Sequence, residues 1–227
     1  IKIAQATAKE PMMAVKALNA CRDAMNGKES GFLVNLDCTA SGLQIMAALT
    51  GCKKTAARVN LIDTGRRENV YDFMATQMKE FGIDVDAKTM KLPTMTTFYG
   101  STEQPKSIFG EDTPELAAFY KVLRDNLGGA WEMLQTVQMQ WDSQWESYGW
   151  DMPDNHRVHI PVMIKKDFKI EIEEFFKRTF TFRTTVNGTK NYSRELCANI
   201  THSVDGYVER EMVRKAKEQG WQIATIH

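Results

Sequence analysis

Three short segments of this 227-residue chain contain residue types and spacings that could carry out chemistry. The first, residues 37–44, reads DCTASGLQ and follows the short apolar run of residues 31–36. That run predicts a buried strand, and a carboxylate at its end points into a cleft. Oxygen ligands of this kind are the ones that hard divalent cations prefer. The alternative is that Asp37 only caps the helix that follows.

The second segment, residues 91–100, reads KLPTMTTFYG. Lys91, Met95 and Tyr99 are spaced four apart, so they share one face of a helix. A Lys on such a face could bind a triphosphate, and a Tyr at the end of the helix could stack on a base. The alternative is an ordinary amphipathic helix in which the alkyl chain of Lys91 covers apolar surface while its ammonium group stays in water.

The third short segment and one longer stretch of the chain have weaker signals. Residues 199–206 read NITHSVDG, and His202 could reach a groove edge or a phosphate, although a lone His more often has a structural role. Residues 165–194 contain five Lys and three Arg against four acidic residues, with Phe side chains interleaved. Basic and aromatic residues together suit a nucleic-acid channel. A pair of strands with core Phe and a charged, solvated face explains the same pattern equally well.

The elements that must position these segments are mostly helices. Helices are expected over residues 1–27, 41–49, 68–81, 91–99 with Pro93 in the first turn, 113–145 with a weak point at 128–129, and 192–219 with a break at 203–206. Strands are expected over residues 31–36, 158–164, 179–185 and 221–226. The pattern predicts a helix-rich α+β fold whose small sheet is assembled from segments far apart in the sequence.

Composition excludes several classes of protein. Lys plus Arg and Asp plus Glu both number 29, so the net charge of zero excludes a strongly basic protein that coats polyanions. No apolar run approaches the ~18 residues of a membrane span. Four Cys without C-x-x-C spacing and four His without H-E-x-x-H spacing argue against a zinc site.

Taken together and in this order, the segments resemble the palm and fingers of single-subunit DNA-dependent RNA polymerases of the bacteriophage and mitochondrial type. Motif A of that family, D-x-[ST]-x-S-G-x-Q, is matched by residues 37–44. Motif B, a Lys followed eight residues later by Tyr-Gly, is matched by residues 91–101. Further matches are VNL at 59–61 with VY at 70–71, HSVDG at 202–206, the W-x-x-P-D turn at 150–154, and IH at 226–227, where motif C begins.

The resemblance implies a right-hand polymerase fold with a small antiparallel palm sheet, lacking a thumb and an N-terminal domain in this chain. It implies that residues 1–66 are a palm part with motif A, residues 67–149 the fingers with motif B, and residues 150–227 a palm part ending at motif C. Because the second catalytic Asp would follow His227, the chain is expected to be a fragment or one subunit, inactive by itself.

The resemblance also implies a two-metal-ion mechanism with two Mg²⁺ ions, which lower the pKa of the RNA 3′-hydroxyl and hold the leaving pyrophosphate. Asp37 and the carbonyl of Cys38 would bind metal, and Lys91 would contact the triphosphate. Tyr99 would sense the ribose 2′-hydroxyl. The remaining contacts would be Tyr71, Lys88, Met95 and Gly42 to the nucleotide and His202, Gly100 and Ser101 to nucleic acid. Lys88 stands beside Ala87, where the family often has an Arg.

The choice of sugar follows from two positions once this fold is granted. Related DNA polymerases have a bulky Glu five residues after the motif A Asp, where it blocks a 2′-hydroxyl, but this chain has Gly42. Those enzymes usually have an aromatic residue four after the motif B Lys, but this chain has Met95. Both differences favour ribonucleotides over deoxyribonucleotides.

The expected function is therefore template-directed RNA synthesis. Its partners would be a DNA template, the RNA product, ribonucleoside triphosphates and a second polymerase subunit if the enzyme is split. A bacteriophage origin would place it in the cytoplasm of an infected bacterium or in the virion. Two alternatives stay open: a non-catalytic palm–fingers remnant that binds nucleic acid or a partner protein, and a related DNA polymerase.

Overall fold

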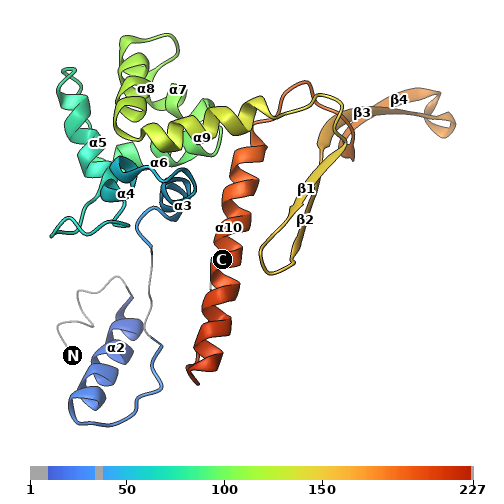
Figure 1. Cartoon of the computed structure of the whole chain (residues 1–227). Helices are drawn as coiled ribbons and strands as arrows, with labels where there is room; N and C mark the ends of the chain where they lie inside the picture. The colour runs from blue at the N-terminus through green and yellow to red at the C-terminus, as the bar shows by residue number, and fades with distance from the viewer. Residues whose placement is uncertain (1–9, 34–37, 226–227) are drawn as a thin grey trace. The chain divides into compact units, whose positions relative to one another are not determined.

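The computed structural model describes residues 10–33 and 38–225, and the chain divides into two compact units. The smaller unit combines the ends of the chain, residues 1–38 and 221–227, and contains helix α2 (Pro11–Met25) (Figure 1). Within the described residues, 31–33 and 221–225 form no strand, so the strands expected there are not seen. Residues 34–37, which complete the first expected strand and include Asp37, lie outside the described residues. So does residue 226 at the end of the second expected strand.

The larger unit, Thr39–Gly220, begins with a body of helices. In chain order these are α3 (Ser41–Thr50), α4 (Lys53–Arg58), α5 (Val70–Lys79), α6 (Ala87–Phe98), α7 (Glu103–Phe109), α8 (Pro114–Asn126) and α9 (Gly128–Met139). Apolar residues at helical spacing turn inward and form one core, in which Met46, Met74, Met90 and Phe119 are fully buried. The flexible Met side chains fill the irregular gaps between these short helices.

Two expectations for these helices need correction. Helix α6 begins at Ala87, so Pro93 lies inside it rather than in its first turn. The missed signal is Asp86, whose carboxylate caps the helix by accepting a 2.7 Å hydrogen bond from the Thr89 N–H. The single long helix expected over residues 113–145 is two helices, because the chain leaves helical geometry at Leu127, next to the predicted weak point.

Two antiparallel hairpins follow the helical body. Strands β1 (Ser147–Asp151) and β2 (Arg157–Pro161) form one, and β3 (Met163–Ile172) and β4 (Arg178–Asn187) form the other. The helix-rich α+β prediction is confirmed. The prediction of a sheet built from distant segments is wrong for the described residues, since each strand pairs with its neighbour in sequence. Short turns make this local pairing easy to form.

Helix α10 (Glu195–Glu218) then runs uninterrupted for 24 residues, so the break expected near Gly206 is absent. Its contacts with the first hairpin explain why it is straight. Trp150 Nε1 donates to Ser203 Oγ at 3.0 Å, Asn199 Nδ2 donates to Tyr148 Oη at 2.6 Å, and Arg210 binds Asp154. The hairpin therefore lies along the helix as seen in Figure 1 and supports it on both sides of Gly206. No helix in the described part of the chain could span a bilayer.

Candidate active site

Tyr99 is the point at which three helices of the larger unit meet. It caps the C-terminus of α6, and its ring meets the ring of His202 on α10 edge-on, with 5.1 Å between the centroids. A Cβ atom built on Gly42 of α3 would lie only 2.5 Å from the Tyr99 hydroxyl oxygen. Three residues from the three separate candidate segments of the sequence therefore lie together.

The ionisation of this cluster follows from its burial. Burial raises the pKa of Tyr99, and the nearby carboxylate of Asp205 raises it further. The pKa of Tyr71 is raised mainly by burial and also by the charge of Tyr99. Both phenols therefore keep their protons at neutral pH and can donate hydrogen bonds. Asp205 was not predicted, although it lies in the HSVDG segment with His202.

The lysines of α6 lie on its exposed side. Lys88 and Lys91 are both exposed and are three residues apart, so they are neighbours on the helix surface. Met95 is half-buried one turn further along, and Tyr99 follows after another turn. The helix predicted from this spacing is confirmed, and it presents two ammonium groups and a phenol in a row. This arrangement is suited to a ligand in which a polyanionic group is attached to a polar ring.

Gly100 and Ser101 follow α6, and Gly100 lies against Arg194 at the start of α10. Gly100 has a φ of +91° and is buried, and a Cβ built there would overlap the backbone carbonyl oxygen of Arg194. The Arg194 guanidinium also donates to the hydroxyl of Thr102. Ser101 is half-buried, and its N–H donates to the Thr96 carbonyl at 2.8 Å. This close approach sets the position of Tyr99 relative to α10.

Replacement of Gly100 by alanine is expected to lower the free energy of unfolding by about 3 kcal/mol, because backbone strain and overlap with Arg194 add together. The matched control is Gly51→Ala, which also changes a glycine with positive φ but has no other atom within 4 Å of the added methyl group. That control is expected to lose only about 1 kcal/mol. Urea titration of both variants measures the difference, and equal losses would show that the Arg194 contact is unimportant.

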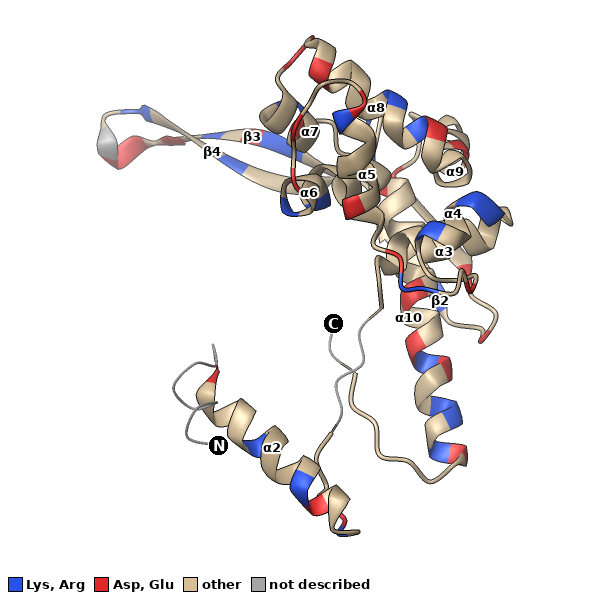
Figure 2. Ribbon diagram, turned by 90° about the vertical axis from the view of Figure 1, so that its left-hand side faces the viewer, with Lys and Arg blue, Asp and Glu red and all other residues tan. Residues whose placement is uncertain are grey.

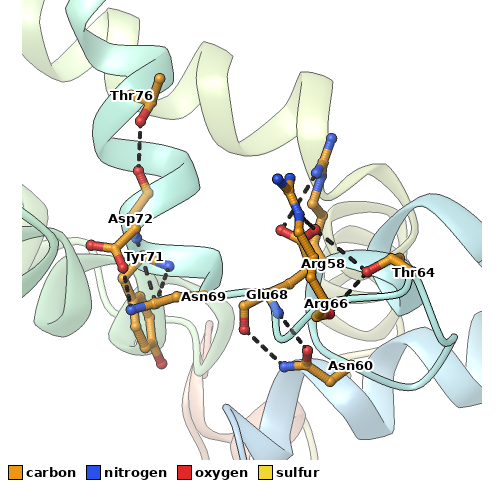
Figure 3. A network of polar contacts seen from close by, with 9 residues as sticks. All are labelled: Arg58, Asn60, Thr64, Arg66, Glu68, Asn69, Tyr71, Asp72 and Thr76. Atoms are coloured by element: carbon orange, nitrogen blue, oxygen red, sulfur yellow. Dashed lines mark hydrogen bonds and ion pairs between the residues drawn. The ribbon is translucent and has the colours of Figure 1, made fainter.

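A polar network ties the end of motif A to the segment before α5. Gln44 Nε2 donates to the Val59 carbonyl at 2.6 Å, and Asn60 Nδ2 donates to Thr39 Oγ1 at 2.8 Å. Glu68, beyond Asn60, forms an ion pair of 2.7 Å with Arg66 (Figure 3). That hydrogen-bonded pair lowers the pKa of Glu68. The VNL segment at 59–61 thus packs against the residues that follow Asp37.

The predicted metal ligands are the least defined part of the site. Asp37 lies outside the described residues, and Cys38, an exposed residue, belongs to the smaller unit. Among residues 10–33 and 38–225, no three His, Cys, Asp or Glu side chains come together as a metal site. The metal-binding roles of Asp37 and Cys38 therefore stay predictions.

Comparison with known proteins bears on the first half of the chain. Residues 7–107 match the sequence profile of a family described as DNA-dependent RNA polymerase. No curated protein matches the chain. The matched span includes Asp37, Gly42, Tyr71, Lys91 and Tyr99, whereas His202 and both hairpins lie beyond it.

Proposed function

We propose that this chain, whose residues 7–107 match the DNA-dependent RNA polymerase family, carries the nucleotide site of a template-directed RNA polymerase. The family implies nucleotide substrates and a nucleic-acid template. The observation that supports the proposal most strongly is the meeting of Gly42, Tyr99 and His202. The matched motifs provide Gly42 and Tyr99, and the fold brings His202 to them from about one hundred residues further along the chain.

In this proposal the incoming ribonucleotide lies over Tyr99. The protonated phenol donates a hydrogen bond toward the ribose 2′-hydroxyl, and the missing side chain of Gly42 leaves room for the phenol to take that position. Tyr71 lines the same site from α5. Lys91 and Lys88, exposed on α6, neutralise the triphosphate. Positive charge placed where negative charge develops on the leaving group favours its departure.

We extend the proposal to Mg²⁺, which when bound would activate the 3′-hydroxyl and neutralise the pyrophosphate. Asp37 and the Cys38 carbonyl are the oxygen ligands proposed in this chain. The division into palm (1–66), fingers (67–149) and palm (150–227) is part of the same proposal. So are a bacteriophage origin and residence in the infected cell or virion.

The hairpin β3–β4 is proposed to lie along nucleic acid, together with Gly100 and Ser101. Phe168 and Phe182 face each other across the two strands with stacked rings 5.6 Å apart. Phe180 and Phe182 are 49% and 46% exposed, which supports a role for these rings in binding. Figure 2 shows Lys and Arg along both strands and acidic residues near the turn. Exposed rings between cations are suited to stacking against bases.

Replacement of Tyr99 by phenylalanine tests the proposed sugar recognition. The variant keeps the ring that packs on His202 but loses the hydroxyl donor, so we expect discrimination between ribo- and deoxyribonucleotides to fall roughly tenfold or more. The measurement is the ratio of the two incorporation efficiencies on a primed DNA template. Tyr120→Phe, at another half-buried tyrosine with a raised pKa, serves as the control and should leave the ratio unchanged. An unchanged ratio in Tyr99→Phe would overturn the role of Tyr99.

A further inference from the structure

Asn60 occupies a place in the network of Figure 3 that none of the proposed roles explains. Its φ is +61°, and it directly follows the end of α4 at Val59. Asparagine is common at this position after a helix because it tolerates the left-handed conformation. The Leu61 N–H donates back to the Ala56 carbonyl at 3.0 Å, as expected for such a helix end. A helix-capping role would be satisfied equally well by glycine.

The side-chain amide of Asn60 does more than end the helix. Its Oδ1 accepts from the Glu68 N–H at 2.7 Å, and its Nδ2 donates to the Glu68 carbonyl at 2.9 Å. The amide thus pairs with both backbone groups of one residue and closes the loop of residues 60–68 at its base. The same Nδ2 donates to Thr39 Oγ1 at 2.8 Å. Only a side chain with a donor and an acceptor at this length can make all three bonds.

The two ends of this clamp lead to different parts of the proposed site. Thr39 is the second residue after Asp37. Glu68 precedes Asn69, whose side-chain oxygen caps α5 by accepting from the Tyr71 N–H at 3.0 Å. The backbone held by Asn60 is therefore the backbone from which the helix bearing Tyr71 begins. In the described part of the chain, Asn60 is the only residue with hydrogen bonds to both Thr39 and Glu68.

We propose that Asn60 is a positioning residue for the nucleotide site, fixing the start of α5, and with it Tyr71, relative to the end of motif A. The inference rests on the function proposed above, because Tyr71 is the residue through which Asn60 acts. Hydrogen bonds of this length fix a geometry that the loop by itself would leave free. Loss of the clamp should then weaken nucleotide binding more than it slows chemistry.

The test compares Asn60→Gly with Asn155→Gly in the complete enzyme. Glycine keeps the positive φ and removes only the amide, and Asn155 is an exposed asparagine of similar φ, +62°, in the β1–β2 turn. We expect Asn60→Gly to raise the KM for ribonucleotides roughly tenfold with kcat within about twofold. Amide hydrogen exchange at Tyr71 and Asp72 should be faster in that variant alone. The control should match the unsubstituted enzyme in both measurements.

Each other result has a defined meaning. An unchanged KM would overturn the proposal. If kcat, ribonucleotide affinity and the unfolding midpoint all fell together, Asn60 would have a merely structural role. That result would also overturn the proposal. If the unsubstituted enzyme adds no nucleotide at all, the proposed function fails. Hydrogen exchange then decides the clamp alone: faster exchange at Tyr71 in Asn60→Gly supports the positioning of α5, and unchanged exchange excludes it.

Discussion

Replacement of Asp37 by alanine is expected to abolish nucleotide addition in the complete enzyme, with a loss on the order of 10³-fold or more. Asp37 is the carboxylate of the matched motif A, and the expected Mg²⁺ would have no other motif A carboxylate to bind. Template affinity should stay nearly unchanged, because a metal ligand at the reacting end contributes little to contacts with the backbone of the template. The measurements are single-nucleotide addition in rapid quench and fluorescence anisotropy with labelled template.

The matched control is Asp142→Ala, which removes an exposed carboxylate that accepts a hydrogen bond from the backbone N–H of Gln144. It should add nucleotides at the unsubstituted rate. Retained turnover in Asp37→Ala would contradict its assignment as a metal ligand. A matching loss of template binding would indicate instead that Asp37 supports the fold.

Replacement of Gly42 by alanine is the second change with a large expected effect. The added methyl group would lie 2.5 Å from the Tyr99 hydroxyl oxygen and 3.1 Å from two ring carbons, so the ring must move. His202 packs against that ring with a centroid distance of 5.1 Å and limits the movement. We expect kcat/KM for ribonucleotides to fall at least tenfold and stability to fall by about 1–2 kcal/mol.

A double variant makes this prediction sharper. In Gly42→Ala combined with Tyr99→Phe the closest atom, the hydroxyl oxygen, is gone, so part of the lost stability should return. The resulting coupling energy should be roughly 1 kcal/mol, as for residues in direct contact. Gly128→Ala is the control, because the added methyl group meets no atom within 4 Å. Additive losses in the double variant would mean that Gly42 and Tyr99 do not touch in solution.

Local signals predicted most of the helices but missed the short helices α4 and α7, and they did not predict the pairing of the strands. Apolar spacing placed α3 and α5 within a few residues, because that spacing reports burial of one helix face directly. In this region strands were predicted only over residues 158–164 and 179–185 and were placed in a sheet of distant segments, whereas β1 pairs with β2 and β3 pairs with β4 in hairpins. Periodicity shows which face of a strand is buried but does not show its partner. The expected break at Gly206 is absent because β1 and its turn support α10 there.

Three of the predicted site residues lie together in the structure, but the contacts that hold them were only partly predicted, and the roles of all the site residues stay predictions. Gly42, Tyr99 and His202 were named from the resemblance, and the structure brings them together. The close approach of Gly100 to the backbone of Arg194 and the three hydrogen bonds of Asn60 were not predicted. Gly100 meets the backbone of a residue distant in the sequence, and Asn60 bonds the backbone of Glu68 and the hydroxyl of Thr39. Side-chain type and spacing contain no information about those partners.

The most direct test of the central claim is the addition of one nucleotide by the complete enzyme to an RNA primer on a DNA template with Mg²⁺. Each ribonucleotide and deoxyribonucleotide is offered separately. We expect the ribonucleotide complementary to the template to be added and to be strongly preferred over its deoxy form. Preference for the deoxyribonucleotide would indicate a DNA polymerase, and template binding without any addition would indicate a non-catalytic remnant. Either result would contradict the proposal that Gly42 and Tyr99 form a ribonucleotide site.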